Sequence, residues 1–197
     1  MRRRHLLAGA GLLALPGCGL SERPYLERRA WPIDVPRPGT PGGAPGGARR
    51  RVVLLRGMQA GPGMDARGLQ VRQADGSVRA EFYETWSTLP AAGAEAALRL
   101  WLESSGRFAA VLAPGSRASP ERVLETELLA LHADPAKGIA RAALSLVVLQ
   151  AGSDRVLGQH MLRGEAPLVG QDAAAMVTAM RAALAQVFAA AEQVAAS

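Results

Sequence analysis

The chain has 197 residues, of which 49% are apolar and 20% are charged, and these are the proportions of an ordinary globular domain. They exclude a chain that is disordered throughout and one that crosses the membrane many times, and the length predicts one domain with tails. The formal net charge of +6 does not predict nucleic-acid binding, because aromatic residues make up only 4% and basic runs are confined to residues 2–4 and 49–51.

The first eighteen residues have the pattern of an export signal. Three arginines at positions 2–4 precede an apolar run over residues 6–15, which is shorter than the roughly 20 residues of a membrane-spanning helix. Leu15-Pro16-Gly17-Cys18 follows and resembles the bacterial lipobox, in which the peptide is cut before the cysteine and the cysteine is acylated. The sequence therefore predicts a signal peptide over residues 1–17 and a lipid anchor on Cys18.

Two alternatives concern this segment. A cytosolic protein with a buried cysteine would require the arginines, the apolar run and the small residue before Cys18 to coincide at the N-terminus. Arg3-Arg4 also resembles a twin-arginine signal, so both Sec and twin-arginine export stay open. Gly19 stands where an aspartate would resemble an inner-membrane retention signal. We therefore expect the acylated Cys18 to insert into a lipid bilayer of a Gram-negative cell envelope. We expect this bilayer to be the outer membrane, with the domain facing the periplasm.

A linker is expected between the anchor and the domain. Residues 32–48 contain five prolines and five glycines, a composition that neither a helix nor a central strand tolerates. We read residues 18–50 as the lipidated N-terminus and a flexible spacer, with the domain over residues 51–197. Because Trp31, Ile33 and Val35 alternate, a short edge strand within residues 27–35 stays open.

The first half of the domain begins with strands. Residues 52–55 form an apolar run, and two alternating segments at 69–71 and 78–82 flank Asp75-Gly76, which predicts a hairpin. The pattern then changes to a helical period over residues 91–105, with Ala94, Leu98 and Trp101 on one face. A strand over residues 108–113 is expected to follow.

The second half predicts three strands and a long helix. The strands cover residues 123–133, 141–150 and 155–163, with a turn at 152–154 between the last two. Asp172 is the expected N-cap of a final helix. The order of elements indicates an α+β fold, with a mixed, mostly antiparallel sheet and two helices on one face.

The final helix has few charges. Between residues 173 and 194 only Arg181 and Glu192 are charged, and much of the remaining surface is alanine. Alanine is the strongest helix former, which explains the pattern without a partner. The alternative is that a second surface, such as another subunit, covers the alanine face, so homo-oligomer formation stays open.

Side chains with catalytic or metal-binding chemistry are sparse. His5 lies in the signal, and His132 and His160 lie in expected strands without other ligands at metal-binding spacing. Glu125 and Glu127 alternate on one strand, which suits acid–base chemistry but is more common on a solvated face. We expect no metal, no cofactor and no enzymatic activity.

Several stretches together resemble a known family. They are Gly63–Arg72, then Glu81-Phe82-Tyr83-Glu84-Thr85-Trp86 with Pro90, the strand over residues 124–134, and the alanine-rich last helix. In these stretches the chain resembles the auxiliary lipoproteins of bacterial ABC transport systems, the lipoprotein partners of MCE-domain lipid transporters, including the paraquat-inducible type. The resemblance covers roughly residues 50–195.

The resemblance implies a function that the residues by themselves do not. It implies a membrane-anchored, non-enzymatic component that faces the periplasm, docks on an MCE-domain protein with its ABC transporter components, and assists lipid transport between membranes. A structural or pilot-like assembly lipoprotein of the outer membrane is the alternative, since it would share the same anchor. The resemblance assigns no partner-binding residues.

Overall fold

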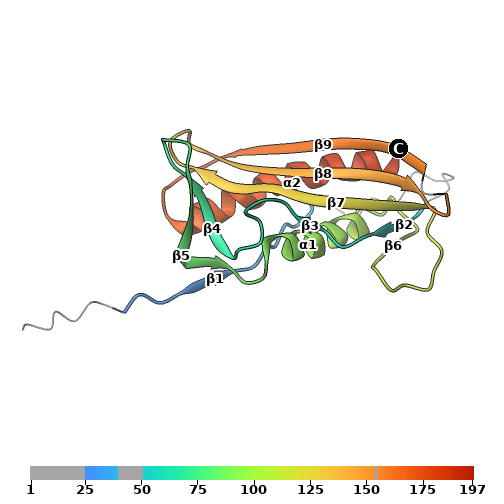
Figure 1. Ribbon diagram of the computed structural model, residues 1–197, viewed down its shortest axis with the longest axis horizontal. Coiled ribbons are helices and arrows are strands. Elements are labelled where there is room, and N and C mark those ends of the chain that lie inside the picture. The colour runs from blue at the N-terminus through green and yellow to red at the C-terminus, as the bar shows by residue number, and fades with distance from the viewer. Residues whose placement is uncertain (1–24, 40–50, 154) are drawn as a thin grey trace, which may run out of the picture.

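The computed structural model describes residues 25–39, 51–153 and 155–197, and Figure 1 shows an open mixed sheet with both helices on one face. This confirms the expected α+β class. The predicted signal peptide and Cys18 lie outside the described residues. In chain order the elements are β1 (Arg29–Trp31), β2 (Val52–Leu55), β3 (Gln59–Ala60), β4 (Gly68–Arg72), β5 (Val78–Trp86), α1 (Pro90–Ser104), β6 (Ala110–Leu112), β7 (Arg122–Asp134), β8 (Ile139–Gln150), β9 (Arg155–Pro167) and α2 (Ala173–Ala196).

One side of the sheet is an antiparallel meander of three long strands. β7 pairs with β8, and β8 pairs with β9, each over most of its length. Leu128 lies opposite Leu144, and both are fully buried toward the helices. Since side chains alternate across a strand, the neighbours of these residues face the uncovered side of the sheet. The three strands predicted for the second half are thus confirmed.

The other edge of β7 is covered by one continuous stretch of chain. β2, β3 and β4 pair with it in turn, and all three run parallel to it. β5 returns antiparallel to β4 as the predicted hairpin, with Asp75 Oδ1 accepting a hydrogen bond from the Ser77 amide at 2.9 Å. β1 then extends the sheet parallel to β5, and β6 lies parallel to β2.

Helix α1 begins at Pro90, whose fixed φ and missing amide suit the first helical position. The expected apolar face is buried: Ala94, Leu98 and Trp101 all lie in the core. The three charged residues of this helix, which are spaced four apart, do not all pair with one another. Arg99 and Glu103 are 4.0 Å apart, whereas Glu95 instead accepts a hydrogen bond from the Met58 amide at 2.7 Å.

Helix α2 begins at the predicted cap, where Asp172 Oδ1 accepts a hydrogen bond from the Ala175 amide at 2.7 Å. By length and composition this helix would be able to cross a membrane. Its apolar face is instead packed on β8 and β9, with Leu184, Val187 and Phe188 completely buried. α2 is therefore the core helix of this domain.

The N-terminal segment, by which we mean residues 25–39, differs from the expected spacer. Arg29–Trp31 forms the edge strand that the sequence left open, and Ile33 and Val35 are buried in the core. The proline-rich composition excludes regular structure here but does not prevent packing, because prolines at positions 32 and 36 leave the side chains between them free to alternate. The packed part of the chain thus begins well before residue 51.

Candidate functional site: the groove between the helices

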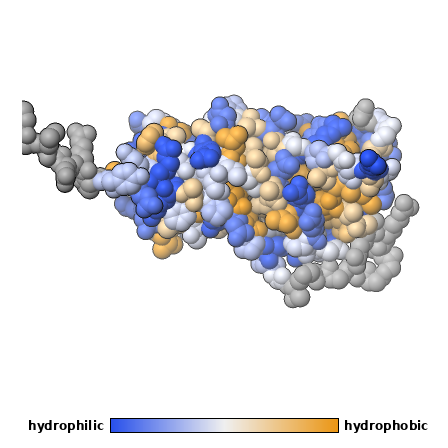
Figure 2. All heavy atoms as spheres, turned by 90° about the horizontal axis from the view of Figure 1, so that it is seen from below, coloured by the Kyte–Doolittle hydropathy of each residue, from blue (hydrophilic) through white to orange (hydrophobic). Residues whose placement is uncertain are grey.

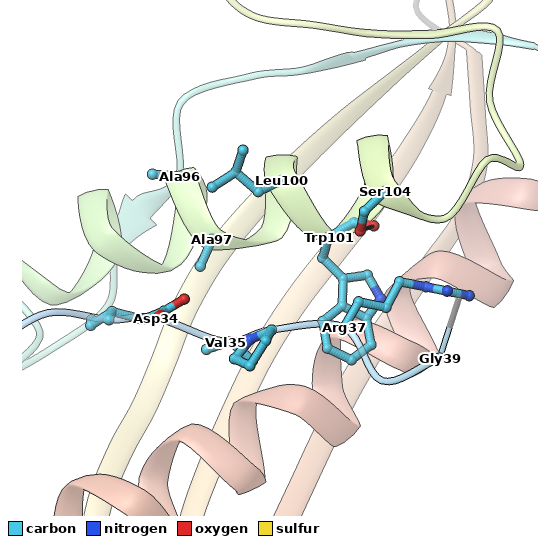
Figure 3. Close-up of a pocket in the computed structure, with 11 residues that line it drawn as sticks. Asp34, Val35, Arg37, Gly39, Ala96, Ala97, Leu100, Trp101 and Ser104 are labelled. Carbon is cyan, nitrogen blue, oxygen red and sulfur yellow. Dashed lines mark hydrogen bonds between the residues drawn. The ribbon is translucent and has the colours of Figure 1, made fainter. Parts of the chain in front are cut away.

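The N-terminal segment runs along a groove between α1 and α2, as Figure 3 shows for residues 34–39. Ile33 and Val35 point into the core, while Asp34 and Pro36, which alternate with them, are exposed. This alternation is that of an extended chain with one buried face. The segment therefore closes the groove as a third element beside the two helices.

Both charged residues of α2 bind this segment. Arg181 donates two hydrogen bonds to the Pro32 carbonyl, at 3.2 Å from Nε and 2.6 Å from the terminal nitrogen. At the other end, Arg37 donates hydrogen bonds to both carboxylate oxygens of Glu192, at 2.9 Å from Nε and 3.2 Å from Nη2. The two charges that stand out in the sequence of the last helix thus fix the two ends of the N-terminal segment.

Glu192 is the centre of a buried polar network. Only 3% of the residue is exposed, and its carboxylate also accepts a hydrogen bond from Trp101 Nε1 at 2.9 Å. Arg107 lies 3.7 Å from the same carboxylate. The hydrogen bond with Glu192 raises the pKa of Arg37. A buried carboxylate is tolerated when it is paired and hydrogen-bonded, and here the network joins α1, α2 and the N-terminal segment.

A hollow lies on each side of the segment. The first has a volume of about 440 Å³ and is bounded by α1 through Ala96, Leu100 and Trp101. The second has about 330 Å³ and is bounded by α2 through Thr178 and Ala182. The N-terminal segment therefore borders the alanine-rich side of α2 but leaves Ala182 exposed. Other alanines of this helix, at positions 174 and 189, are exposed.

The outer side of α1 carries exposed apolar side chains beside the charged residues Arg99 and Glu103. Leu100 is 62% exposed and Leu89, at the N-cap, is 48% exposed. Figure 2, which views the molecule from below relative to Figure 1, shows hydrophobic residues toward the middle of this face and the end away from residue 25. The end at which residue 25 lies is mainly hydrophilic, with a few separate hydrophobic residues.

The two histidines of the domain lie apart. His160 is exposed on β9, whereas His132 is half-buried on β7. Burial lowers the pKa of His132, and the nearby guanidinium groups of Arg72 and Arg141 lower it further, against the opposite effect of Asp134. Within the described residues no three side chains of His, Cys, Asp or Glu come together in a metal-binding group.

Glu125 and Glu127 are both partly exposed on the side of the sheet away from the helices. Glu125 pairs with Arg56. This pair borders a third hollow, of about 700 Å³, between β2, β7 and residues 114–115.

The sequence did not predict the groove, although two signals for it were present. Arg181 and Glu192 are isolated charges on an otherwise apolar helix, and Ile33 and Val35 alternate inside a proline-rich stretch. Each signal has an ordinary local explanation, and only their contact shows that they belong together. Cys18, the one site residue predicted from the sequence, lies outside the described residues.

The fold defines an α+β domain that incorporates its own N-terminal segment, and comparison with known proteins places it further. The family model described as "ABC-type transport auxiliary lipoprotein component" matches residues 35–194. The chain belongs to this family, so it is a transport auxiliary lipoprotein of the bacterial cell envelope, as the resemblance in the sequence implied. The family match begins inside the N-terminal segment, at Val35.

Two solved structures share the fold. Protein XCC0632 from Xanthomonas campestris is 22% identical, with a TM-score of 0.65, over 83% of this chain and 88% of that one. An uncharacterized protein is 10% identical, with a TM-score of 0.64, over 85% and 99% of the two chains. At these identities the likeness concerns the fold alone. No curated protein matches this chain.

Proposed function

We propose that this protein is a non-enzymatic accessory lipoprotein that docks on the MCE-domain component of an ABC transport system and assists lipid transport between the membranes. The observation that carries the proposal is the family match over residues 35–194, together with the lipobox-like sequence that ends at Cys18. Acylation of Cys18 anchors the domain in the envelope, in the outer membrane facing the periplasm, and several acyl chains give a stable anchor.

The groove supports a binding role for the domain. Its charged side chains, Arg37, Arg181 and Glu192, hold the chain's own N-terminal segment in place. They are thereby engaged in structure, which suits a scaffold better than a catalyst. The exposed leucines at 89 and 100 make the outer side of α1 a candidate surface for a partner protein.

Crosslinking in native membranes tests the proposal. The full-length protein with a C-terminal tag is crosslinked and purified, and the proteins recovered with it are identified, with Cys18→Ala as the unanchored control. We expect an MCE-domain protein to be recovered only when Cys18 is intact. Recovery of an unrelated outer-membrane complex without an MCE-domain protein would instead establish the assembly role and refute the transport role.

Self-association belongs to the same proposal, because exposed alanines on α2 would suit contact with a second copy. Light scattering of the detergent-solubilised lipoprotein measures the mass of the assembly. A strictly monomeric mass at all concentrations would exclude the homo-oligomer and leave docking on the MCE-domain protein unaffected.

A further inference from the structure

The N-terminal segment limits how far the domain can lie from its anchor. Residues 29–31 pair with β5, Arg29 Nε lies 2.8 Å from Glu84 Oε1, and the Ser87 amide donates a hydrogen bond to the Trp31 carbonyl at 2.7 Å. The described chain begins at Tyr25. From Cys18 to Tyr25 there are seven residues, which span at most about 25 Å even when fully extended.

The end of the molecule that this tether reaches has an unusual set of exposed side chains. Tyr25 is 90% exposed, Phe82 is 66% exposed, and Leu26 and Tyr83 are also exposed. Arg28 lies over the Phe82 ring at 4.5 Å from its centroid. We call these five residues, Tyr25, Leu26, Arg28, Phe82 and Tyr83, the tether surface.

Two aromatic residues of this surface, Phe82 and Tyr83, lie together. The Phe82 and Tyr83 rings meet edge to face with centroids 5.1 Å apart, and β1 brings Arg28 beside them from a distant part of the sequence. Exposure of aromatic rings to water is unfavourable, and contact with another surface that removes them from water lowers the free energy. The segment Glu81–Trp86, which carries part of the family resemblance, thus has an exposed part that the core does not explain.

The composition of the surface indicates the interfacial region of a bilayer. Aromatic side chains with polar tips, and long basic side chains beside them, are typical of the level of the lipid headgroups. The charges of residues 25–31 and 78–86 balance, with three arginines and three glutamates. Membrane contact therefore depends mainly on burial of the aromatic rings at the interface and not on attraction to anionic lipid.

We infer that the tether surface contacts the surface of the membrane in which Cys18 is anchored, so that the domain rests on the bilayer by the end that carries β1 and β5. This inference depends on the proposed acylation of Cys18. The contact is shallow, because this end is mainly hydrophilic with separate hydrophobic residues (Figure 2). The opposite end, with residues 113–120 (Figure 1), then points away from the membrane.

A fluorescent label provides the test. Cys18 is the only cysteine and its sulfur is alkylated in the lipoprotein, so an introduced cysteine is the only free thiol. Ala30 is exposed on β1 beside the tether surface, and Ser119 is exposed at the opposite end. Ala30→Cys and Ser119→Cys are each labelled with an environment-sensitive dye in the full lipoprotein and reconstituted into vesicles of phosphatidylethanolamine and phosphatidylglycerol.

We expect the label at position 30 to shift its emission to shorter wavelength in vesicles, with little dependence on salt, and the label at position 119 to stay unshifted. The double variant Phe82→Ser and Tyr83→Ser is expected to abolish the shift at position 30. Val156→Ser, which removes an exposed apolar side chain on β9, is the matched control and keeps the shift.

The outcomes separate this inference from the anchor itself. Mass spectrometry of the N-terminal peptide shows whether Cys18 is acylated, and an unacylated cysteine would refute the anchor and the inference with it. An acylated protein in which both labels report water would refute the membrane contact alone. A shift that survives the double variant, accompanied by lost recovery of a partner protein, would show that the tether surface binds protein and not lipid.

Discussion

Replacing Glu192 by alanine tests the network that holds the N-terminal segment. The change removes the acceptor of Trp101 Nε1 and the partner of Arg37. A buried donor left without an acceptor costs about 1–3 kcal/mol. The Arg37 side chain is 21% exposed, so its lost ion pair adds less than a fully buried pair would, about 1 kcal/mol.

We therefore expect Glu192→Ala to lower the free energy of unfolding by roughly 2–4 kcal/mol. For a chain of this size, 3 kcal/mol corresponds to a decrease in Tm of roughly 6–12 °C. Urea unfolding of the detergent-solubilised lipoprotein, followed by tryptophan fluorescence, measures the change. The double variant Arg37→Ala and Glu192→Ala is expected to lose less than the sum of the two single variants, because the pair is coupled.

Gln193→Ala is the matched control, since this neighbouring residue is exposed and accepts one hydrogen bond from Arg107 at 2.7 Å. Its effect is expected to stay within about 0.5 kcal/mol. If Glu192→Ala is no more destabilising than this control, the network does not fix the N-terminal segment and the reasoning is wrong.

Three further predictions concern the packing and the pH dependence of stability. Ile33→Ala should cost about 2 kcal/mol or more, since it removes a buried side chain, whereas Asp34→Ala should change the urea midpoint little; equal small effects would restore the spacer interpretation. Gly164→Ala places a Cβ against a backbone carbonyl of α2 and should lower the free energy of unfolding by about 1–3 kcal/mol. The control Gly158→Ala meets only the end of a side chain. An equal loss of Tm in both variants would contradict the close approach of β9 to α2 at Gly164. The pKa of His132 is lowered in the folded state, so the unfolded chain takes up the proton first as the pH falls through about 6.5, and stability should decrease below that pH. His132→Gln should weaken this pH dependence of stability between pH 7.5 and 5. If the dependence of Tm on pH is the same in His132→Gln as in the unaltered protein, His132 is not its source.

Local sequence determined the secondary structure closely. The helical period over residues 91–105 and the cap at Asp172 correspond to α1 and α2, because amphipathic spacing and capping act within a few residues. The hairpin around Asp75-Gly76 was predictable for the same reason. The family resemblance could also be read from the sequence, since it depends on the order of residues and not on their contacts.

Only the tertiary structure decided what the N-terminal segment does. Its composition predicts a spacer, but Ile33 and Val35 are buried because α1 and α2, formed far along the chain, leave a groove between them. Likewise, β2, β3 and β4 line up along one edge of β7 through parallel pairings with residues about 60 to 70 positions away. Such contacts depend on which surfaces remain unburied once the elements have formed, and no local pattern encodes that. The sequence by itself therefore determined the elements and the predicted anchor, and the tertiary structure decided that residues 29–37 are part of the domain.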